Sequence, residues 1–128
     1  MTQINDPAIV AELTDLYLKY EKALVENDIA TMDELFWDSP AVLRFGATEN
    51  LYGIDEIRAF RQARPTQNLA RDISHLQVVT FDADTAVVTL EFRRVTDGVP
   101  RFGRQSQVWR KLPQGWKIVS AHVSLLPG

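Results

Sequence analysis

Four β-like segments fill the second half of the chain, and they restrict the possible folds more than any other feature of the sequence. They are predicted at residues 70–81, 86–96, 102–112 and 116–125. Short turns rich in Asp, Gly and Pro separate them, which is typical of antiparallel hairpins. A meander of this kind forms one sheet, and another layer must cover its apolar face.

The first half of the chain carries the residues of that second layer. Asn5 or Asp6 can cap a helix with Pro7 at its first position, and apolar residues recur at helical spacing up to Leu24. Further elements are predicted as a short helix at 29–36, a strand at 41–46, a turn at 47–53, a helix at 54–64 and a loop at 65–68. This order predicts an α+β fold, with helices packed on one face of a curved antiparallel sheet and a single domain spanning residues 1–128.

Arg44 is the one charged residue in the predicted strand at 41–46. A charge inside an apolar strand is costly unless it is paired or meets an anion. In the helix that follows, the residues expected to face inward are Ile54, Ile57, Ala59 and Phe60, and those expected outward or at a rim are Arg58, Arg61 and Arg64. We therefore interpret this stretch as organised around the position that Arg44 reaches.

Composition excludes several classes of protein. The chain of 128 residues has no cysteine, so it has no disulfide framework and no thiolate nucleophile or metal ligand. Its first residues lack the pattern of a secretory signal, and no apolar run approaches the ~20 residues that span a bilayer. We expect a cytoplasmic protein with no membrane partner.

The charges are distributed unevenly along the chain. Residues 1–43 carry two lysines against nine acidic residues, whereas residues 44–128 carry twelve lysines and arginines against eight acidic residues. The net charge is −3, and the arginines are scattered through strands. Nucleic-acid-binding proteins are usually basic overall, so we expect a small anionic ligand rather than a nucleic acid.

Tyr20 and Arg44 are the leading candidates for catalytic residues. Tyr20 lies on the apolar stripe of the first helix, and Arg44 lies on a strand that the helices should cover. A guanidinium can bind a carboxylate with two hydrogen bonds, and a phenol can donate to a developing oxyanion or relay a proton. On residue types alone, a core tyrosine hydrogen-bonded to a structural arginine is the commoner arrangement.

Three motifs in the sequence resemble a known family. They are YEKALVENDIATMDELFWDSPAVLRFGATENLYGIDEIRAFR, GRQSQVW and GWKIVSAHVS. Together they resemble the AtzH/HpxZ group of the nuclear transport factor 2-like superfamily, over nearly the whole chain. The resemblance implies a cone-like fold, and it implies catalytic roles for a tyrosine and an arginine at the positions of Tyr20 and Arg44.

Other residues are candidates for substrate binding. Arg71 precedes a strand and is either a second cation of the pocket or a surface residue. Ser106 and Gln107 lie on opposite faces of the strand at 102–112, so only one of them can face the pocket unless a bulge intervenes. His122 is either a proton carrier or ligand donor, or a buried structural histidine. His75 is the only other histidine, and no HxH or HxxxH motif is present, so no metal site is predicted.

The resemblance implies a small hydrolase that uses no cofactor. The implied reaction is the decarboxylating hydrolysis of an N-carboxylated urea such as 1,3-dicarboxyurea, or of a related ureido acid, in cyanuric acid or oxalurate breakdown. The alternative is a non-catalytic module that binds a small anion or supports a partner amidase. Apolar residues occur on both faces of the long strands, so we also expect a homodimer that buries the outer sheet face.

Overall fold

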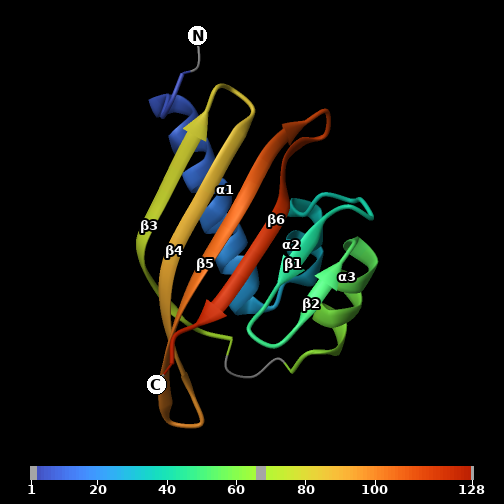
Figure 1. The fold of residues 1–128 in the computed structure, drawn as a ribbon, viewed down its shortest axis with the longest axis vertical. Helices are drawn as coiled ribbons and strands as arrows, with labels where there is room; N and C mark the ends of the chain where they lie inside the picture. The colour runs from blue at the N-terminus through green and yellow to red at the C-terminus, as the bar shows by residue number, and fades with distance from the viewer. Residues whose placement is uncertain (1–2, 66–68, 128) are drawn as a thin grey trace.

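The computed structural model describes residues 3–65 and 69–127, and it has a six-stranded sheet with three helices packed against it (Figure 1). The elements are α1 (Pro7–Glu26), α2 (Ile29–Leu35), β1 (Leu43–Phe45), β2 (Asn50–Tyr52), α3 (Ile54–Ala63), β3 (Asp72–Phe81), β4 (Thr85–Thr96), β5 (Val99–Leu112) and β6 (Gly115–Leu125). The strand order is β2-β1-β6-β5-β4-β3. The predicted α+β fold is confirmed.

The first two helices begin where the side chains of Asp6 and Asp28 cap them. The carboxylate of Asp6 accepts a hydrogen bond from the backbone of Ala8, and Pro7 takes the first helical position of α1. Asn27 ends α1 in the left-handed conformation, and Asp28 caps α2 at once. The two helices are therefore joined by a very short connection, and both turn their apolar residues toward the sheet.

The long strands form the predicted antiparallel meander, and β1 adds to its edge in parallel with β6. The strand β2 was not predicted, because its three residues fall in the segment 47–53 that we expected to be a turn. The actual turn is tighter: the Gly46 amide donates to the Glu49 carbonyl at 2.8 Å. A strand of three residues carries too little alternation to be recognised in a sequence.

The helix α3 buries a different set of residues from the predicted set. Ile54, Ile57 and Arg61 are buried, whereas Ala59 is exposed and Phe60 is partly buried. Arg61 lies four residues after Ile57 and therefore shares its face. The charge of Arg61 is paired with Asp33 at 2.6 Å and lies 4.4 Å from the centre of the Phe36 ring. Of the loop predicted at 65–68, residues 66–68 lie outside the described part of the chain.

A bulge in β6 reverses which residues face the helices. Ile118 pairs with Trp109, but the next pair along the ladder joins Ser120 to Val108, so Val119 is an extra residue. Before the bulge, Ile118 faces inward; after it, Ala121 does. An extra residue shifts the alternation by one position, so every later side chain of β6 exchanges faces.

The free edge of β3 is partly covered by the N-terminal segment. Residues 3–5 run antiparallel to the end of β3 through a bridge between Ile4 and Phe81. The backbone and side chain of Asn5 both bond to the backbone of Thr80, each at 3.0 Å.

Among the helices of the described residues, none is long and apolar enough to cross a membrane.

Candidate functional site

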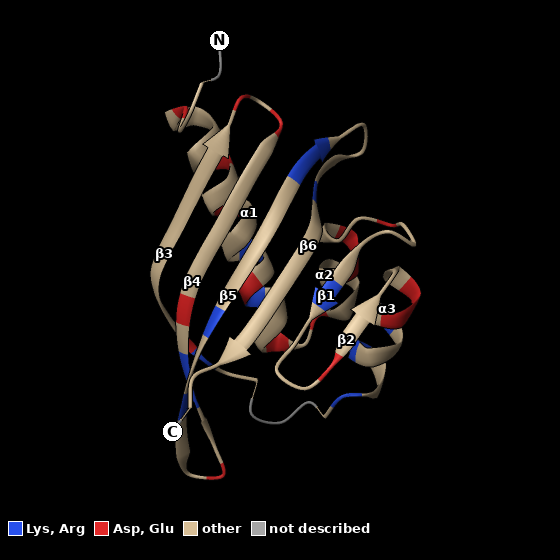
Figure 2. Ribbon diagram, in the orientation of Figure 1, with Lys and Arg blue, Asp and Glu red and all other residues tan. Residues whose placement is uncertain are grey.

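A cavity of about 480 Å³ opens on the inner side of β1 and β6, next to the end of α3. Its wall includes Arg44, Glu49, Phe60, Arg64, Arg94 and Val123. Three of these residues are arginines and one is acidic, and we call this space the arginine cavity. In Figure 2, basic residues colour β1, the lower ends of β4 and β5, and the segment after α3.

Arg44 faces inward from β1. Its neighbours in the sheet, Leu51 on β2 and Ala121 on β6, are both buried, so all three share the inner face. The side chain is 12 % exposed, and its guanidinium forms an ion pair with Glu49 at 2.8 Å and lies 5.4 Å from the centre of the Phe60 ring. Arg44 is thus held at the cavity wall, and its charge is balanced by a residue of the adjacent turn.

Among the described residues, neither Arg64 nor Arg94 forms an ion pair with a carboxylate. Burial lowers the pKa of both guanidiniums. The positive charges of Arg44 and Arg61 lower the pKa of Arg64 further, against the opposing effects of Tyr20 and Glu49. The Nε atoms of Arg64 and Arg94 are buried without a hydrogen-bond partner among the described residues. Such groups are rare in folded proteins and usually meet water or a ligand.

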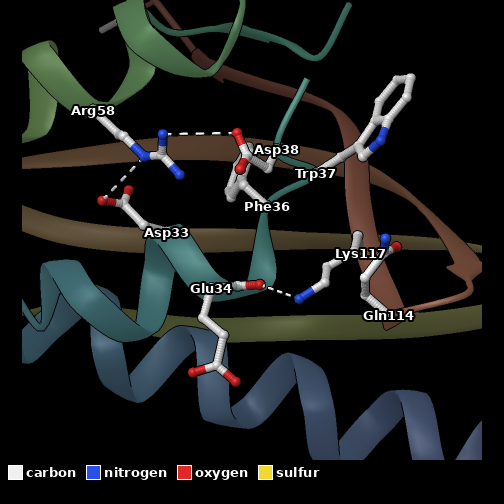
Figure 3. Close-up of a pocket in the computed structure, with 8 residues that line it drawn as sticks. All are labelled: Asp33, Glu34, Phe36, Trp37, Asp38, Arg58, Gln114 and Lys117. Atoms are coloured by element: carbon white, nitrogen blue, oxygen red, sulfur yellow. Dashed lines mark hydrogen bonds and ion pairs between the residues drawn. The ribbon is translucent and has the colours of Figure 1, made fainter. Parts of the chain in front are cut away.

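A second hollow, of about 370 Å³, lies between α2, α3 and the start of β6 (Figure 3). Its charged side chains are largely paired with each other, since Arg58 lies 3.8 Å from Asp33 and 3.7 Å from Asp38. The ammonium of Lys117 donates to the backbone carbonyl of Glu34 at 2.5 Å. Acidic side chains outnumber basic ones here, so this hollow suits an anion less well than the arginine cavity does.

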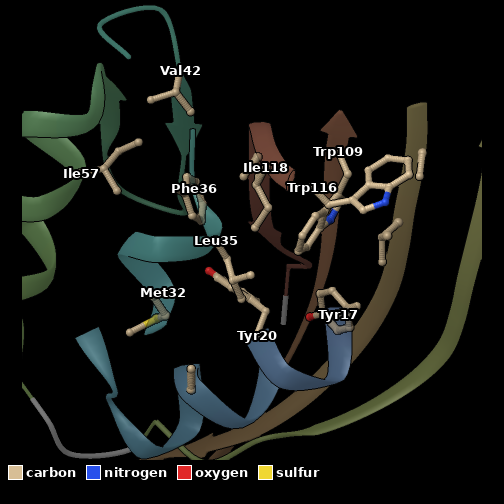
Figure 4. Packing of buried hydrophobic residues seen from close by; sticks show 14 of the residues in the cluster. Tyr17, Tyr20, Met32, Leu35, Phe36, Val42, Ile57, Trp109, Trp116 and Ile118 are labelled. Carbon is tan, nitrogen blue, oxygen red and sulfur yellow. The ribbon is translucent and has the colours of Figure 1, made fainter. Parts of the chain in front are cut away.

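Tyr20 lies buried between α1 and α2 and extends toward Phe36 and Leu35 (Figure 4). Its ring centre is 6.0 Å from the ring centres of both Tyr17 and Phe36. No hydrogen bond of its hydroxyl is found among the described residues, which is unusual for a buried tyrosine. Tyr20 does not line the arginine cavity, although it acts electrostatically on Arg64, which does.

Arg71 belongs to a buried network beside α1, and it does not line the arginine cavity. Its side chain is 5 % exposed, and the guanidinium binds the Glu21 carboxylate through Nε at 2.8 Å and through a terminal nitrogen at 2.7 Å. It also donates to the Gln105 side chain at 2.9 Å and to the Tyr17 hydroxyl at 3.2 Å. Because the guanidinium of Arg71 already binds the Glu21 carboxylate with two hydrogen bonds, it has a structural role and does not offer these donors to a substrate.

The two faces of β5 separate the remaining candidates. Gln107 is buried on the inner face, and its carbonyl accepts a hydrogen bond from the Trp109 indole at 3.0 Å. Ser106 is exposed on the outer face, where it pairs with His122. His122 is exposed because the bulge in β6 shifts its alternation, and its ring packs edge-on against Phe45. The sheet therefore separates Ser106 and His122 from Arg44.

Sequence reasoning did not assign Glu49, Arg64 or Arg94 to the site, although it expected Arg64 outward or at a rim. Arg94 follows Val88, Leu90 and Phe92 at alternate positions of β4, all on the inner face. This alternation predicts that Arg94 also faces inward. Glu49 and Arg64 left no comparable signal, because one lies on a turn and the other lies just after a helix. Only the fold brings these two elements to one cavity.

The sequence model of the AtzH-like family matches residues 2–128. This match covers nearly the entire chain. The chain belongs to the AtzH-like family. A search of the curated proteins finds no significant match to this AtzH-like protein.

Solved structures agree with this assignment. A protein of unknown function from Pectobacterium atrosepticum is 48 % identical, with a TM-score of 0.92 over 97 % of this AtzH-like chain and 95 % of its own. A cystatin-like fold protein from Burkholderia xenovorans is 42 % identical, with a TM-score of 0.92 over 100 % and 99 % of the two chains. A nuclear transport factor 2-like protein from Salmonella enterica, at 23 % identity and a TM-score of 0.77 over 95 % and 94 %, shares the fold.

Proposed function

We propose that this protein is a small, cofactor-independent amidohydrolase that removes a carboxylate from an N-carboxylated urea, such as 1,3-dicarboxyurea, in cyanuric acid or oxalurate breakdown. The observation that carries the proposal is the arginine cavity, where three guanidiniums face one carboxylate. Membership in the AtzH-like family supports the same substrate class. A carboxylated urea is small, planar and anionic, and it fits a cavity of about 480 Å³.

Arg44 is the residue that orients the substrate in this proposal. Its planar guanidinium can bind a carboxylate through two parallel hydrogen bonds. The residue now bound there is Glu49, at 2.8 Å, so the substrate carboxylate takes the place of the Glu49 carboxylate. Phe60 packs against Arg44 and keeps its guanidinium at the wall of the cavity.

The reaction then breaks the bond between nitrogen and the carboxylate carbon. The electron pair of that bond goes to the nitrogen, the carboxylate leaves as carbon dioxide, and the nitrogen takes a proton. Tyr20 does not line the cavity, so in this proposal its hydroxyl supplies the proton, or stabilises the charge that develops, through an intervening water molecule, and water restores the proton. Hydration of the carbon dioxide gives bicarbonate, so the overall reaction is a hydrolysis and needs no side-chain nucleophile.

The test is a steady-state assay of the purified protein on freshly generated 1,3-dicarboxyurea, with carbon dioxide release as the readout. Tyr20→Phe should lower kcat while substrate binding is kept, because only the hydroxyl is lost. Arg44→Lys should lose affinity, because lysine keeps the charge but not the planar fork. Loss of a charged contact of this kind costs roughly 2–5 kcal/mol.

An exposed residue outside the site provides a matched control, Arg93→Lys on the outer face of β4. This variant should keep full activity. The competing function is an anion-binding module that supports a partner amidase, and the position of Tyr20 outside the cavity wall favours it. Binding of the anion with no turnover, or full activity in Tyr20→Phe, would replace the catalytic proposal with that one.

A further inference from the structure

The reaction proposed above needs a proton donor at the wall of the arginine cavity, because the nitrogen that loses its carboxylate must take a proton there. Tyr20 lies outside this wall. Among the described residues of the wall, Glu49 is the one acidic side chain, and the rest are arginines, threonines and apolar residues. Carboxyl groups are common proton donors in enzymes. Glu49 is therefore the side chain best placed to donate a proton inside the cavity.

The two carboxylate oxygens of Glu49 have different partners. Oε2 accepts a hydrogen bond from Arg44 at 2.8 Å, and Oε1 accepts one from the hydroxyl of Thr48 at 3.0 Å. The amide of Gly46 donates to the backbone carbonyl of Glu49 at 2.8 Å and closes the turn between β1 and β2. If a ligand takes the place of Glu49 at Arg44, only the side chain has to rotate. This side chain is 19 % exposed, so a proton on its carboxyl group can exchange with solvent.

The charges that face Glu49 come from three elements. Arg44 on β1 pairs with it directly, and Arg64 after α3 and Arg94 on β4 interact with it electrostatically. All three are positive and favour the ionised carboxylate. A substrate carboxylate that binds Arg44 separates Glu49 from the nearest of these charges and places a negative charge beside it. Both changes favour the protonated form of Glu49, because neighbouring carboxylates repel each other when both are ionised.

We propose that Glu49 is a further catalytic residue, which exchanges Arg44 for a proton when the substrate binds and delivers that proton to the nitrogen from which carbon dioxide leaves. This inference rests on the proposed function and supplies its proton donor. The bond between nitrogen and the carboxylate carbon breaks, its electron pair goes to the nitrogen, and the nitrogen takes the proton of the Glu49 carboxyl group. Tyr20 then has the other role, and it stabilises the developing charge through water.

The release of carbon dioxide restores the starting state of the site. Carbon dioxide is uncharged, so Arg44 loses its anion when the carboxylate leaves. Glu49 has just given up its proton and is ionised, so it pairs with Arg44 again. Each turnover consumes one proton, which Glu49 takes from solvent when the next substrate binds.

The exchange of Arg44 for a proton can be tested without turnover. Glutarate is an unreactive probe of the cavity, since its carboxylates are separated by three atoms, as they are in 1,3-dicarboxyurea. Isothermal titration calorimetry at about pH 6.5, where free carboxylates are ionised, is carried out in two buffers of different ionisation enthalpy. The wild-type protein should take up protons from the buffer as glutarate binds, whereas Glu49→Gln should bind glutarate without proton uptake.

Steady-state kinetics on 1,3-dicarboxyurea test the delivery of the proton. In Glu49→Gln, kcat should fall by roughly 100-fold or more, because the proton donor is lost. The KM should stay unchanged or fall, because the competitor of the substrate at Arg44 is also lost. A residue with a purely structural role would not separate the two constants in this way. Glu49→Asp keeps a carboxyl group and should have a higher kcat than Glu49→Gln. Asp55→Asn, an exposed change on α3, is the matched control and should follow the wild type in both experiments.

Two results would overturn the proposal: a wild-type protein that takes up no proton with glutarate, or a Glu49→Gln variant that keeps the kcat of the wild type. The first result needs no variant, so it decides even if a thermal melt shows that Glu49→Gln fails to fold. Proton uptake without any release of carbon dioxide would reject the proposed function and the delivery step together, and the exchange at Glu49 would then be a feature of anion binding.

Discussion

Glu49 binds the arginine that we assign to the substrate. Its carboxylate lies 2.8 Å from Arg44 and is also held by the side chain of Thr48, at 3.0 Å. It folds back against Gly46, where a Cβ atom would overlap the carboxylate. A side chain at position 46 would therefore displace the Glu49 carboxylate from this position. Glu49 acts as an internal anion that the substrate must displace.

Removal of that internal anion should make binding tighter. In Glu49→Gln, Arg44 no longer has a competing carboxylate, so we expect the Kd of glutarate to fall several-fold. The same change leaves a partly buried guanidinium without its counter-ion, and stability should fall by about 1–3 kcal/mol. Calorimetry and a thermal melt measure the two effects, with the exposed Asp55→Asn as the control. Weaker glutarate binding in Glu49→Gln would mean that Glu49 helps to bind the ligand.

At the scale of elements, one network ties α1 to the sheet. The Tyr17 hydroxyl donates to the Glu21 carboxylate at 2.8 Å, and it accepts hydrogen bonds from Gln105 of β5 at 3.0 Å and from Arg71, just before β3, at 3.2 Å. Arg71 also lies 4.5 Å from the centre of the Phe92 ring. The network therefore positions the helix that carries Tyr20.

This network predicts how stability depends on pH. Burial raises the pKa of Tyr17 above its ordinary value of 10.0, against the lowering effect of Arg71. The unfolded chain therefore loses this proton at a pH where the folded protein keeps it. The contribution of Tyr17 to stability is complete below about pH 10 and is lost above it, by at most about 1.4 kcal/mol per pH unit.

The measurement is the free energy of unfolding between pH 8.5 and 11 for the wild type and for Tyr17→Phe. The wild type should lose stability faster above pH 10, and the difference between the two proteins isolates Tyr17 from the other groups that titrate there. Parallel curves for the wild type and Tyr17→Phe would contradict the coupling.

The sequence predicts most elements but not which face each residue takes. Periodicity identified the helices and the four long strands, because each is long enough to show its repeat. His122 could not be placed, because its face depends on the bulge at Val119, which no alternation pattern reveals. Arg61 was misplaced because its burial depends on Asp33, a residue of another helix. Contacts between distant elements decide both cases, and local patterns do not contain them.

At the scale of the whole molecule, the outer face of the sheet carries a row of side chains across all six strands. The row consists of Val79, Val87, Val108, Ser120, Leu43 and Tyr52, which pair in register from β3 to β2. Five of the six are apolar or aromatic. Ser106, His122 and Phe45 lie in the neighbouring row. A largely apolar row on an outer face is typical of an interface between protein chains.

We therefore expect a homodimer in which two such faces pack together. Light scattering at micromolar concentration should give twice the mass of the chain. Val87→Lys places a charge near the middle of the row and should give the monomer mass without loss of helical content. Ser74→Lys, on the outer face of β3 away from the row, is the control and should stay dimeric. A monomer mass for the wild-type protein would reject this interface.

The N-terminal segment along β3 also bears on aggregation. Six-stranded open sheets have two edges, and an exposed edge can recruit strands from other molecules into growing assemblies. One edge here is β2, whose three residues offer few free backbone groups. At the other edge, residues 3–5 occupy one end of β3, and the irregular pairing between Ser74 and Gln77 disturbs the remainder. The outer face of the sheet can therefore be apolar enough to bind one partner chain. Both edges of the sheet, in contrast, resist the addition of strands from further molecules.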